Sequence, residues 1–185
     1  NEISAGDYLI IQFGHNDATQ GDPNRYTDPT GGVLDEGSFK NSLMDYINLA
    51  KNRGAYPILA TSISNLTLDG SYVIPYATAA RELGNALNIP VIDLYTKTHL
   101  WINSVGTEYA KRLFLYIRPQ DTRFTPHPYF SGTEYYTDGK SDGVHLNIFG
   151  ADLVAQWATE ELTRLNHPLS TKLSDYRVSD QLPEY

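Results

Sequence analysis

Three short apolar segments constrain the fold of this chain more than any other feature. They are DYLIIQF at 7–13, YPILATSI at 56–63 and IPVIDL at 89–94. None of them alternates apolar with polar residues, so each is expected to be a strand whose two faces are both covered. Strands of this kind are typical of a parallel sheet, because antiparallel sheets commonly leave one face to solvent.

Amphipathic segments lie between and after these strands. One helix is expected from an N-cap at Ser38 to Gly54, and a second over 75–88. Shorter helices are expected over 96–106 and 108–114, and Asn147 precedes the most periodic segment of the chain.

The alternation of strands and helices predicts an α/β protein. The expected architecture is a three-layer α/β/α sandwich around a parallel, doubly wound, flavodoxin-like sheet. Residues 1–166 form the expected domain, and 167–185 are expected to be a tail on its surface.

Composition excludes several function classes. The chain has 185 residues, enough for one well-packed domain, and a net charge of −8 that disfavours a broad nucleic-acid or anionic-membrane surface. No apolar run approaches the roughly 20 residues needed to cross a bilayer. With no cysteine, the chain has no disulfide, no thiol nucleophile and no cysteine-ligated zinc.

Two long segments without periodicity interrupt this plan, at 18–37 and 118–142. Loops of this length are usually functional or disordered. Because ligands of open parallel sheets bind beyond the carboxyl ends of the strands, the first of them leaves the sheet where a site is expected.

The first strand runs into FGHND, where a side-chain amide follows a glycine. Gly14 permits a close approach of the backbone, and Asn16 then presents a donor that can stabilise an oxyanion without titrating. The alternative is that Asn16 and Asp17 simply form a turn.

The second polar motif, DGVH, stands just before the last helix. Gly143 lets the expected loop turn tightly, so that Asp142 can bind one ring nitrogen of His145 and leave the other free as a general base. The alternative is a loop at a helix start with a solvated histidine. A metal site from His15, Asp17, Asp142 and His145 lacks any ligand-spacing motif, so no metal or other cofactor is expected.

The two motifs, in this order and on this expected fold, resemble those of the SGNH (GDSL-type) hydrolases. The resemblance is closest to the rhamnogalacturonan acetylesterase-like carbohydrate esterases. DYLIIQFGHND looks like the family's Gly-x-Asn-Asp block, and DGVHLNIFGADLVA looks like its Asp-x-x-His block with the following helix. The resemblance spans about 6–165. It implies that Asn16 donates to the oxyanion, that His145 is the base and that Asp142 orients it. Asp17 would brace the loop, and His15 would be a pocket or structural residue.

The chain departs from the family pattern at the nucleophile. The family's Gly-Asp-Ser block and its second, glycine-bearing block are both absent, and LDGSY at 68–72 does not follow a strand. Ser62 and Ser64 are expected to be turn or surface hydroxyls. The first strand is the most apolar of the three, so it should have neighbours on both edges. Both observations indicate that the first two strands of the fold, about 60–90 residues with their helices, lie outside this chain.

The resemblance implies a secreted serine esterase that removes acetyl groups from a cell-wall polysaccharide, in particular pectic rhamnogalacturonan. The expected partners are the polysaccharide and the missing N-terminal segment that carries Ser and Gly. Aromatic residues of the second long segment, Tyr129 and Phe130, would wall the sugar groove together with Arg123. Arg118, Arg123 and Lys140 would meet uronate groups.

The alternative function is a non-catalytic carbohydrate-binding fragment or a pseudoenzyme without its nucleophile. A flavodoxin-like nucleotide binder is disfavoured, because no glycine-rich phosphate loop follows any strand.

Overall fold

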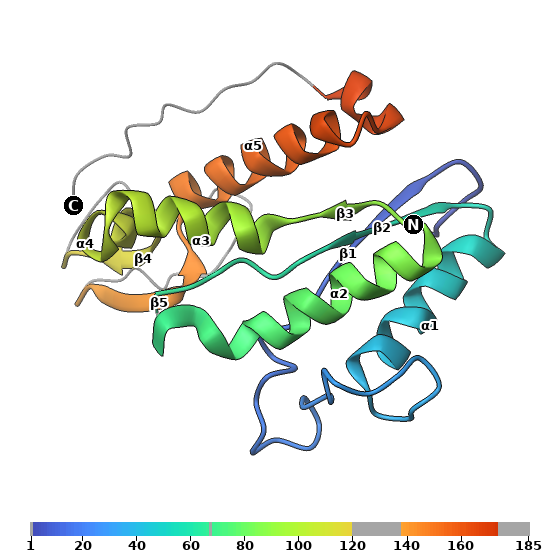
Figure 1. The fold of residues 1–185 in the computed structure, drawn as a ribbon. Helices are drawn as coiled ribbons and strands as arrows, with labels where there is room; N and C mark the ends of the chain where they lie inside the picture. The colour runs from blue at the N-terminus through green and yellow to red at the C-terminus, as the bar shows by residue number, and fades with distance from the viewer. Residues whose placement is uncertain (1, 67, 120–137, 174–185) are drawn as a thin grey trace.

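The computed structural model describes residues 2–66, 68–119 and 138–173 (Figure 1). A three-stranded parallel sheet has the order β1-β2-β3, with β1 at Tyr8–Gln12, β2 at Tyr56–Ala60 and β3 at Val91–Ile92. The three predicted strands are therefore confirmed, although each is shorter than its apolar segment.

Helices cover both faces of this sheet and make the predicted three-layer sandwich. Figure 1 shows one pair of helices below the sheet and the other pair above it. The four helices are α1 (Phe39–Asn52), α2 (Ile74–Leu87, entered through the 3-10 turn Leu68–Val73), α3 (Leu94–Val105) and α5 (Ile148–Arg164).

The apolar core is divided by the sheet. On the α1 and α2 side, Ile11 and Leu59 pack against Phe39 and Leu83. On the α3 and α5 side, a second cluster contains Ile58 and other buried residues: Ala60, Ile92, Leu113, Leu153, Trp157 and Leu162. Because successive residues of β2 contribute to both clusters, neither face of this strand can be polar, as the uninterrupted apolar pattern predicts.

Asn147, the predicted cap of the last helix, anchors α5. Its side-chain oxygen accepts a hydrogen bond from the Gly150 N–H at 2.8 Å, and its amide nitrogen donates to the carbonyls of Arg112 and Phe114 at 2.8 Å each. A Cβ atom at Gly150 would lie 1.9 Å from the Leu113 carbonyl oxygen, so only glycine lets the helix start this close to the chain. The start of α5 is thus fixed against the segment before β4.

The region after α3 differs from the prediction of a helix over 108–114. The structure has a short helix α4 (Thr107–Ala110), a 3-10 turn (Lys111–Leu113) and a strand β4 (Phe114–Ile117). This strand pairs antiparallel with β5 (Lys140–Leu146). Leu113 and Phe114 are fully buried, so tertiary packing and strand pairing override the local helical pattern.

Within the described residues, β1 has a neighbouring strand on one side only. Near its open edge, Ile10 is 49% exposed and Phe13 43% exposed. Phe13 contacts the ring of Tyr46, which is also exposed on α1. The expectation that both faces of this strand are covered is therefore wrong for β1 as described.

The segment after α5 is not entirely without structure. Pro168–Lys172 form a 3-10 turn, and Leu169 packs against the cluster beneath α5. The domain boundary after residue 166 stays a prediction. Among the described residues, no helix has the length and apolar character needed to cross a membrane.

The long loop after β1 is irregular, as predicted, and is held by Tyr76 of α2. The buried Tyr76 hydroxyl lies 2.8 Å from the carbonyl oxygen of Asp17 and 2.9 Å from that of Thr27, with a single proton to share between them. Burial raises the pKa of Tyr76 to about 12, and the nearby Tyr26, Asp17 and Asp28 add to this shift.

The pKa of Tyr76 predicts a specific loss of stability in alkali. Because the pKa of Tyr76 is higher in the folded than in the unfolded state, the neutral hydroxyl stabilises the folded protein. This contribution to the free energy of unfolding, of order 2–3 kcal/mol, is fully present below about pH 10 and is lost as the pH approaches about 12. Tyr76→Phe should lower the free energy of unfolding at neutral pH and remove this part of the alkaline dependence.

Chemical denaturation of the wild type and Tyr76→Phe from about pH 8 to pH 12 measures the difference, with the exposed Tyr46→Phe as the control. A difference between wild type and Tyr76→Phe that stays constant over this range would contradict the role of the hydroxyl.

Candidate active site

The carboxyl end of β1 lies against the segment that follows β2. Gly14 has φ +135°, a conformation that favours glycine, and a Cβ atom there would lie 2.1 Å from the Ser62 Oγ. The Ser62 hydroxyl donates to the Phe13 carbonyl at 2.7 Å. Ser62 and Ser64 are both buried, so the expectation of turn or surface hydroxyls is wrong for them.

Asp17 holds the backbone around Asn16. Its Oδ2 accepts from the Gly14 N–H at 2.9 Å, and its Oδ1 accepts from the Thr27 hydroxyl at 3.0 Å. Asn16 is exposed, and none of the described residues forms a hydrogen bond with its side-chain amide. The donor is therefore free to bind a ligand, on a loop braced by its neighbour.

Asp142 borders a bulge of strand β5 and His145 lies within it, so neither is in the predicted loop. Phe114 pairs with Leu146 and Leu115 pairs with Asp142, so 143–145 are left out of the pairing. The Oδ1 of Asp142 accepts from the backbone N–H groups of Val144 at 2.8 Å and His145 at 3.0 Å. Strand pairing with β4, a long-range contact, explains why local sequence suggested only a loop.

The hydrogen bond that the spacing predicts is present. His145 Nδ1–H donates to the second carboxylate oxygen of Asp142, Oδ2, over 2.8 Å. The His145 side chain is 74% exposed, and its Nε2 has no hydrogen-bond partner among the described residues. An ionised carboxylate at Nδ1 fixes the tautomer that leaves the Nε2 lone pair available to take a proton.

The carboxylate of Asp142 is stabilised in its charged form. Burial alone would raise the pKa of Asp142, but hydrogen bonds from the backbone N–H groups of His145 and Val144, together with the ring and charge of His145, lower it overall. Asp142 therefore stays ionised, and orients His145, to a lower pH than an ordinary aspartate would.

One short segment, Ser62–Leu66, joins the two motifs. Ser62 contacts the end of β1, and the Leu66 N–H donates to the Gly143 carbonyl in the bulge at 2.9 Å. A Cβ atom at Gly143 would lie 3.0 Å from Leu66, so the bulge packs closely on this segment. The GHND and DGVH motifs are thus brought to the same end of the sheet, as the family resemblance requires.

His15 of the GHND motif is partly buried and faces the charge of His145. Burial lowers its pKa, the charge of His145 lowers it further, and hydrogen bonding to the backbone of Ile63 partly opposes both. Its Nε2 is buried and has no hydrogen-bond partner among the described residues. The lowered pKa favours the neutral form of His15 beside His145, and its expected role as a pocket or structural residue stays a prediction.

The predicted substrate-binding residues Arg123, Tyr129 and Phe130 lie outside the described residues, and their roles stay predictions. In the described part of the chain, no group of three or more His, Asp or Glu side chains could hold a metal ion.

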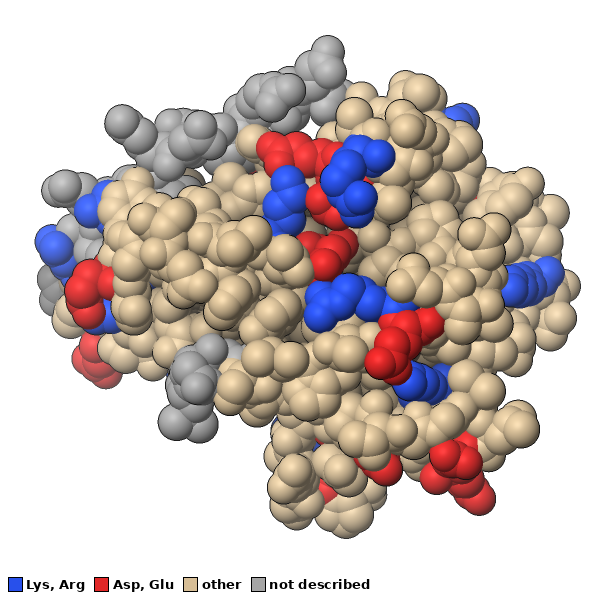
Figure 2. Space-filling model, viewed as in Figure 1, with Lys and Arg blue, Asp and Glu red and all other residues tan. Residues whose placement is uncertain are grey.

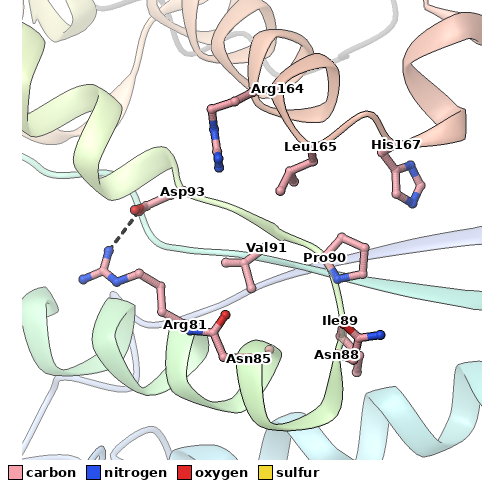
Figure 3. Close-up of a pocket in the computed structure, with 11 residues that line it drawn as sticks. Arg81, Asn85, Asn88, Ile89, Pro90, Val91, Asp93, Arg164, Leu165 and His167 are labelled. Atoms are coloured by element: carbon pink, nitrogen blue, oxygen red, sulfur yellow. Dashed lines mark hydrogen bonds and ion pairs between the residues drawn. The ribbon is translucent and has the colours of Figure 1, made fainter.

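Two cavities lie in different parts of the molecule. One of about 400 Å³ adjoins the bulge of β5 and includes Ser141, the residue before Asp142. A larger one of about 580 Å³ lies at the β3 edge, between the last turns of α2 and α5 (Figure 3).

The charges around the larger cavity neutralise one another. Arg81 pairs with Asp93 at 2.9 Å, and Arg164 pairs with the buried Glu161 at 2.8 Å. Lys97 binds Glu160 at 3.0 Å, and Figure 2 shows such alternating charges on this face. The cavity is therefore a balanced ion-pair region away from the imidazole of His145.

Comparison with known proteins identifies the family. No family model matches the sequence. "Rhamnogalacturonan acetylesterase RhgT" of Bacillus subtilis (strain 168) is 32% identical over 176 residues, which cover 92% of this chain and 67% of the relative. The chain belongs to the SGNH hydrolases of the rhamnogalacturonan acetylesterase group.

A second relative agrees with this assignment, and two solved structures share the fold. "Probable rhamnogalacturonan acetylesterase YesY" of the same organism is 25% identical over 175 residues, 92% of this chain and 69% of the relative. The B. subtilis YXIM structure has a TM-score of 0.61 at 24% identity, covering 89% of this chain and 38% of that one. "A possible lipase from Chitinophaga pinensis DSM 2588" has a TM-score of 0.51 at 16% identity, covering 88% and 74%. Both structures support the SGNH hydrolase fold alone.

The sequence did not reveal two parts of this SGNH site. The segment TSISN after β2 looked like an ordinary strand end, yet its buried polar residues connect the motifs. Tyr116 of β4 was also missed, and its hydroxyl would lie 3.3 Å from a Cβ atom at Gly143. The run of polar residues directly after a buried strand is the signal that could have identified the segment.

The geometry predicts the tautomer of His145. In the wild type, neutral His145 should carry its proton on Nδ1, because Asp142 accepts it there. In Asp142→Asn the side-chain amide can donate to Nδ1 instead, so a population protonated on Nε2 should appear.

Long-range ¹H–¹⁵N NMR of the imidazoles measures this, with His99, which contacts Asn103, as an internal control that should not change. A wild-type His145 protonated on Nε2 when neutral would contradict the arrangement.

Proposed function

We propose that this chain is part of a serine esterase that removes acetyl groups from a pectic polysaccharide of the rhamnogalacturonan class. The observation that carries the proposal is the Asp142–His145 pair, 2.8 Å apart, with a free Nε2 at the end of the sheet that also bears Asn16. The names of the two relatives, both rhamnogalacturonan acetylesterases, support the acetylated pectic substrate.

In the proposed mechanism, a serine hydroxyl attacks the acetyl carbonyl while His145 Nε2 takes its proton. Asp142 stabilises the imidazolium, and the amide of Asn16 donates to the oxyanion of the tetrahedral intermediate. His145 then returns the proton to the departing sugar oxygen, which leaves an acetyl-serine. Water, activated by the same imidazole, hydrolyses this ester to acetate and restores the serine.

The serine of this mechanism comes from a segment outside these 185 residues, which lack a Gly-Asp-Ser block. We place that segment beside β1. The exposed apolar side chains of Ile10, Phe13, Tyr46 and Leu49, which are 43–49% exposed, favour a covering neighbour there. The same edge ends at Gly14 and Asn16, so a strand added to it would deliver a hydroxyl close to the oxyanion donor.

The proposal also assigns the substrate contacts and the location. Arg123, Tyr129 and Phe130 would wall the groove that binds the polysaccharide. Because such a polymer is too large to enter a cell, the enzyme would be secreted.

A non-catalytic carbohydrate-binding protein is the second candidate, and the absence of the Gly-Asp-Ser block favours it. This protein would retain the groove but release no acetate under any condition. The experiment that follows separates the two functions.

Acetate release from acetylated rhamnogalacturonan should require a nucleophile-bearing complement. We expect no release by the chain alone and release after addition of an N-terminal segment carrying Gly-Asp-Ser, because only then is the hydroxyl present. Enzymatic quantification of acetate measures this, and the same segment with Ser→Ala is the matched control. Polysaccharide binding without acetate release in any mixture would favour the second candidate.

In the assembled enzyme, the three catalytic candidates should have separable effects. His145→Ala and Asp142→Ala should each lower kcat by orders of magnitude, because they remove or misorient the base. Asn16→Ala should lower kcat by roughly 10²–10³-fold through loss of an oxyanion donor.

Steady-state kinetics measures these values, with Asn24→Ala, an exposed amide of the same loop, as the control. Wild-type turnover by Asn16→Ala would remove this residue from the mechanism.

A further inference from the structure

The cavity beside the catalytic bulge collects positive charge in a chain that is negative overall. Three cationic side chains line its volume of about 400 Å³: Lys111, Arg118 and Lys140. Glu108 is the single acidic residue of this lining. The net charge of the chain is −8, so this local surplus is not a consequence of composition.

Two of the three cations are not neutralised. Arg118 and Lys140 are exposed and form no ion pair with any described residue. Lys111 contacts both oxygens of Glu108, at 2.7 and 2.8 Å, but this carboxylate is 86% exposed, so the pair is weak and replaceable. The larger cavity at the β3 edge, with its mutually paired charges, offers no comparable surplus.

The positions of these cations are fixed by β4 and β5. Lys140 lies directly opposite Ile117 in the antiparallel pairing, and Arg118 follows Ile117, so both side chains come from the same end of the strand pair. Tyr116 is the aromatic wall of the cavity, with the Lys111 Nζ 5.5 Å from its ring centre. The cation cluster is thus built on paired backbone.

The same tyrosine connects the cavity to the catalytic bulge. The Tyr116 hydroxyl lies against Gly143, the residue next to Asp142, and Ser141 lines the cavity itself. Lys140 precedes His145 by five residues of one strand, a path of at most roughly 17 Å that the bulge shortens. A bound polysaccharide could therefore reach both sites within a few sugar units.

We propose that Lys111, Arg118 and Lys140 form a subsite for a sugar carboxylate. It receives a uronate unit of the polymer while an acetylated unit lies at His145. The Arg118 guanidinium can bind a carboxylate through two parallel hydrogen bonds, and the lysines add point charges. This inference rests on the proposed function and names the feature of the substrate that the enzyme recognises.

The test uses the full-length enzyme. The double variant Arg118→Gln/Lys140→Gln removes the two unpaired charges. The matched control, Lys51→Gln/Lys172→Gln, removes the same charge from exposed positions on α1 and after α5. Kinetics are measured on acetylated rhamnogalacturonan oligomers and on acetylated, uncharged xylo-oligomers. Binding of unacetylated oligogalacturonate is measured separately by titration calorimetry.

The double variant should raise KM for the acidic oligomers roughly 10-fold with little change in kcat, because it removes binding remote from the reacting carbonyl. Kinetics on the uncharged oligomers should not change, which also shows that the variant is folded. The control should behave as the wild type, and added salt should reduce the difference between them.

An equal KM in the double variant and the control, or equal losses on acidic and uncharged oligomers, would overturn the subsite. The calorimetric measurement is independent of the esterase reaction. If the enzyme releases acetate from no substrate, the proposed function fails. The subsite is still supported if oligogalacturonate binding is lost in the double variant and kept in the control. Equal binding by all proteins would reject it.

Discussion

The contact of one buried segment, Ser62–Leu66, with two distant parts of the chain determines the arrangement of this site. The segment binds the end of β1 through Ser62 and the bulge of β5 through Leu66. Ser62 is buried, so breaking its hydrogen bond would leave an unsatisfied polar group behind. The relative position of Asn16 and His145 therefore depends on groups that have no role in the proposed chemistry.

Around this segment, the protein combines a rigid support with exposed reactive groups. Asp17 accepts hydrogen bonds from a backbone N–H and the Thr27 hydroxyl, and Asp142 accepts from backbone N–H groups and the ring of His145, so each uses both carboxylate oxygens. By contrast, the amide of Asn16 and the ring of His145 face outward. Preorganised groups of this kind suit an esterase, because stabilisation of charge in the transition state loses little energy to rearrangement.

The sequence predicted the parallel strands, the four main helices and the Asp142–His145 contact, because these follow from local periodicity, capping residues and short spacing. It did not predict β4 and β5. Their pairing joins residues 23 to 32 positions apart, and FLYI next to a helical pattern carries no local sign of a distant partner. The role of Tyr116 and the proximity of Lys111 to the bulge were missed for the same reason.

The open edge of β1 also affects how the protein can associate with itself in solution. Among the described residues no strand pairs with this edge, so its N–H and C=O groups, flanked by the exposed Ile10 and Phe13, can accept the same strand from a second copy. Two such molecules would join edge to edge about a twofold axis and enclose their apolar side chains between them. Self-association would then compete with the docking proposed above for the nucleophile-bearing segment, because both would use the same edge of β1.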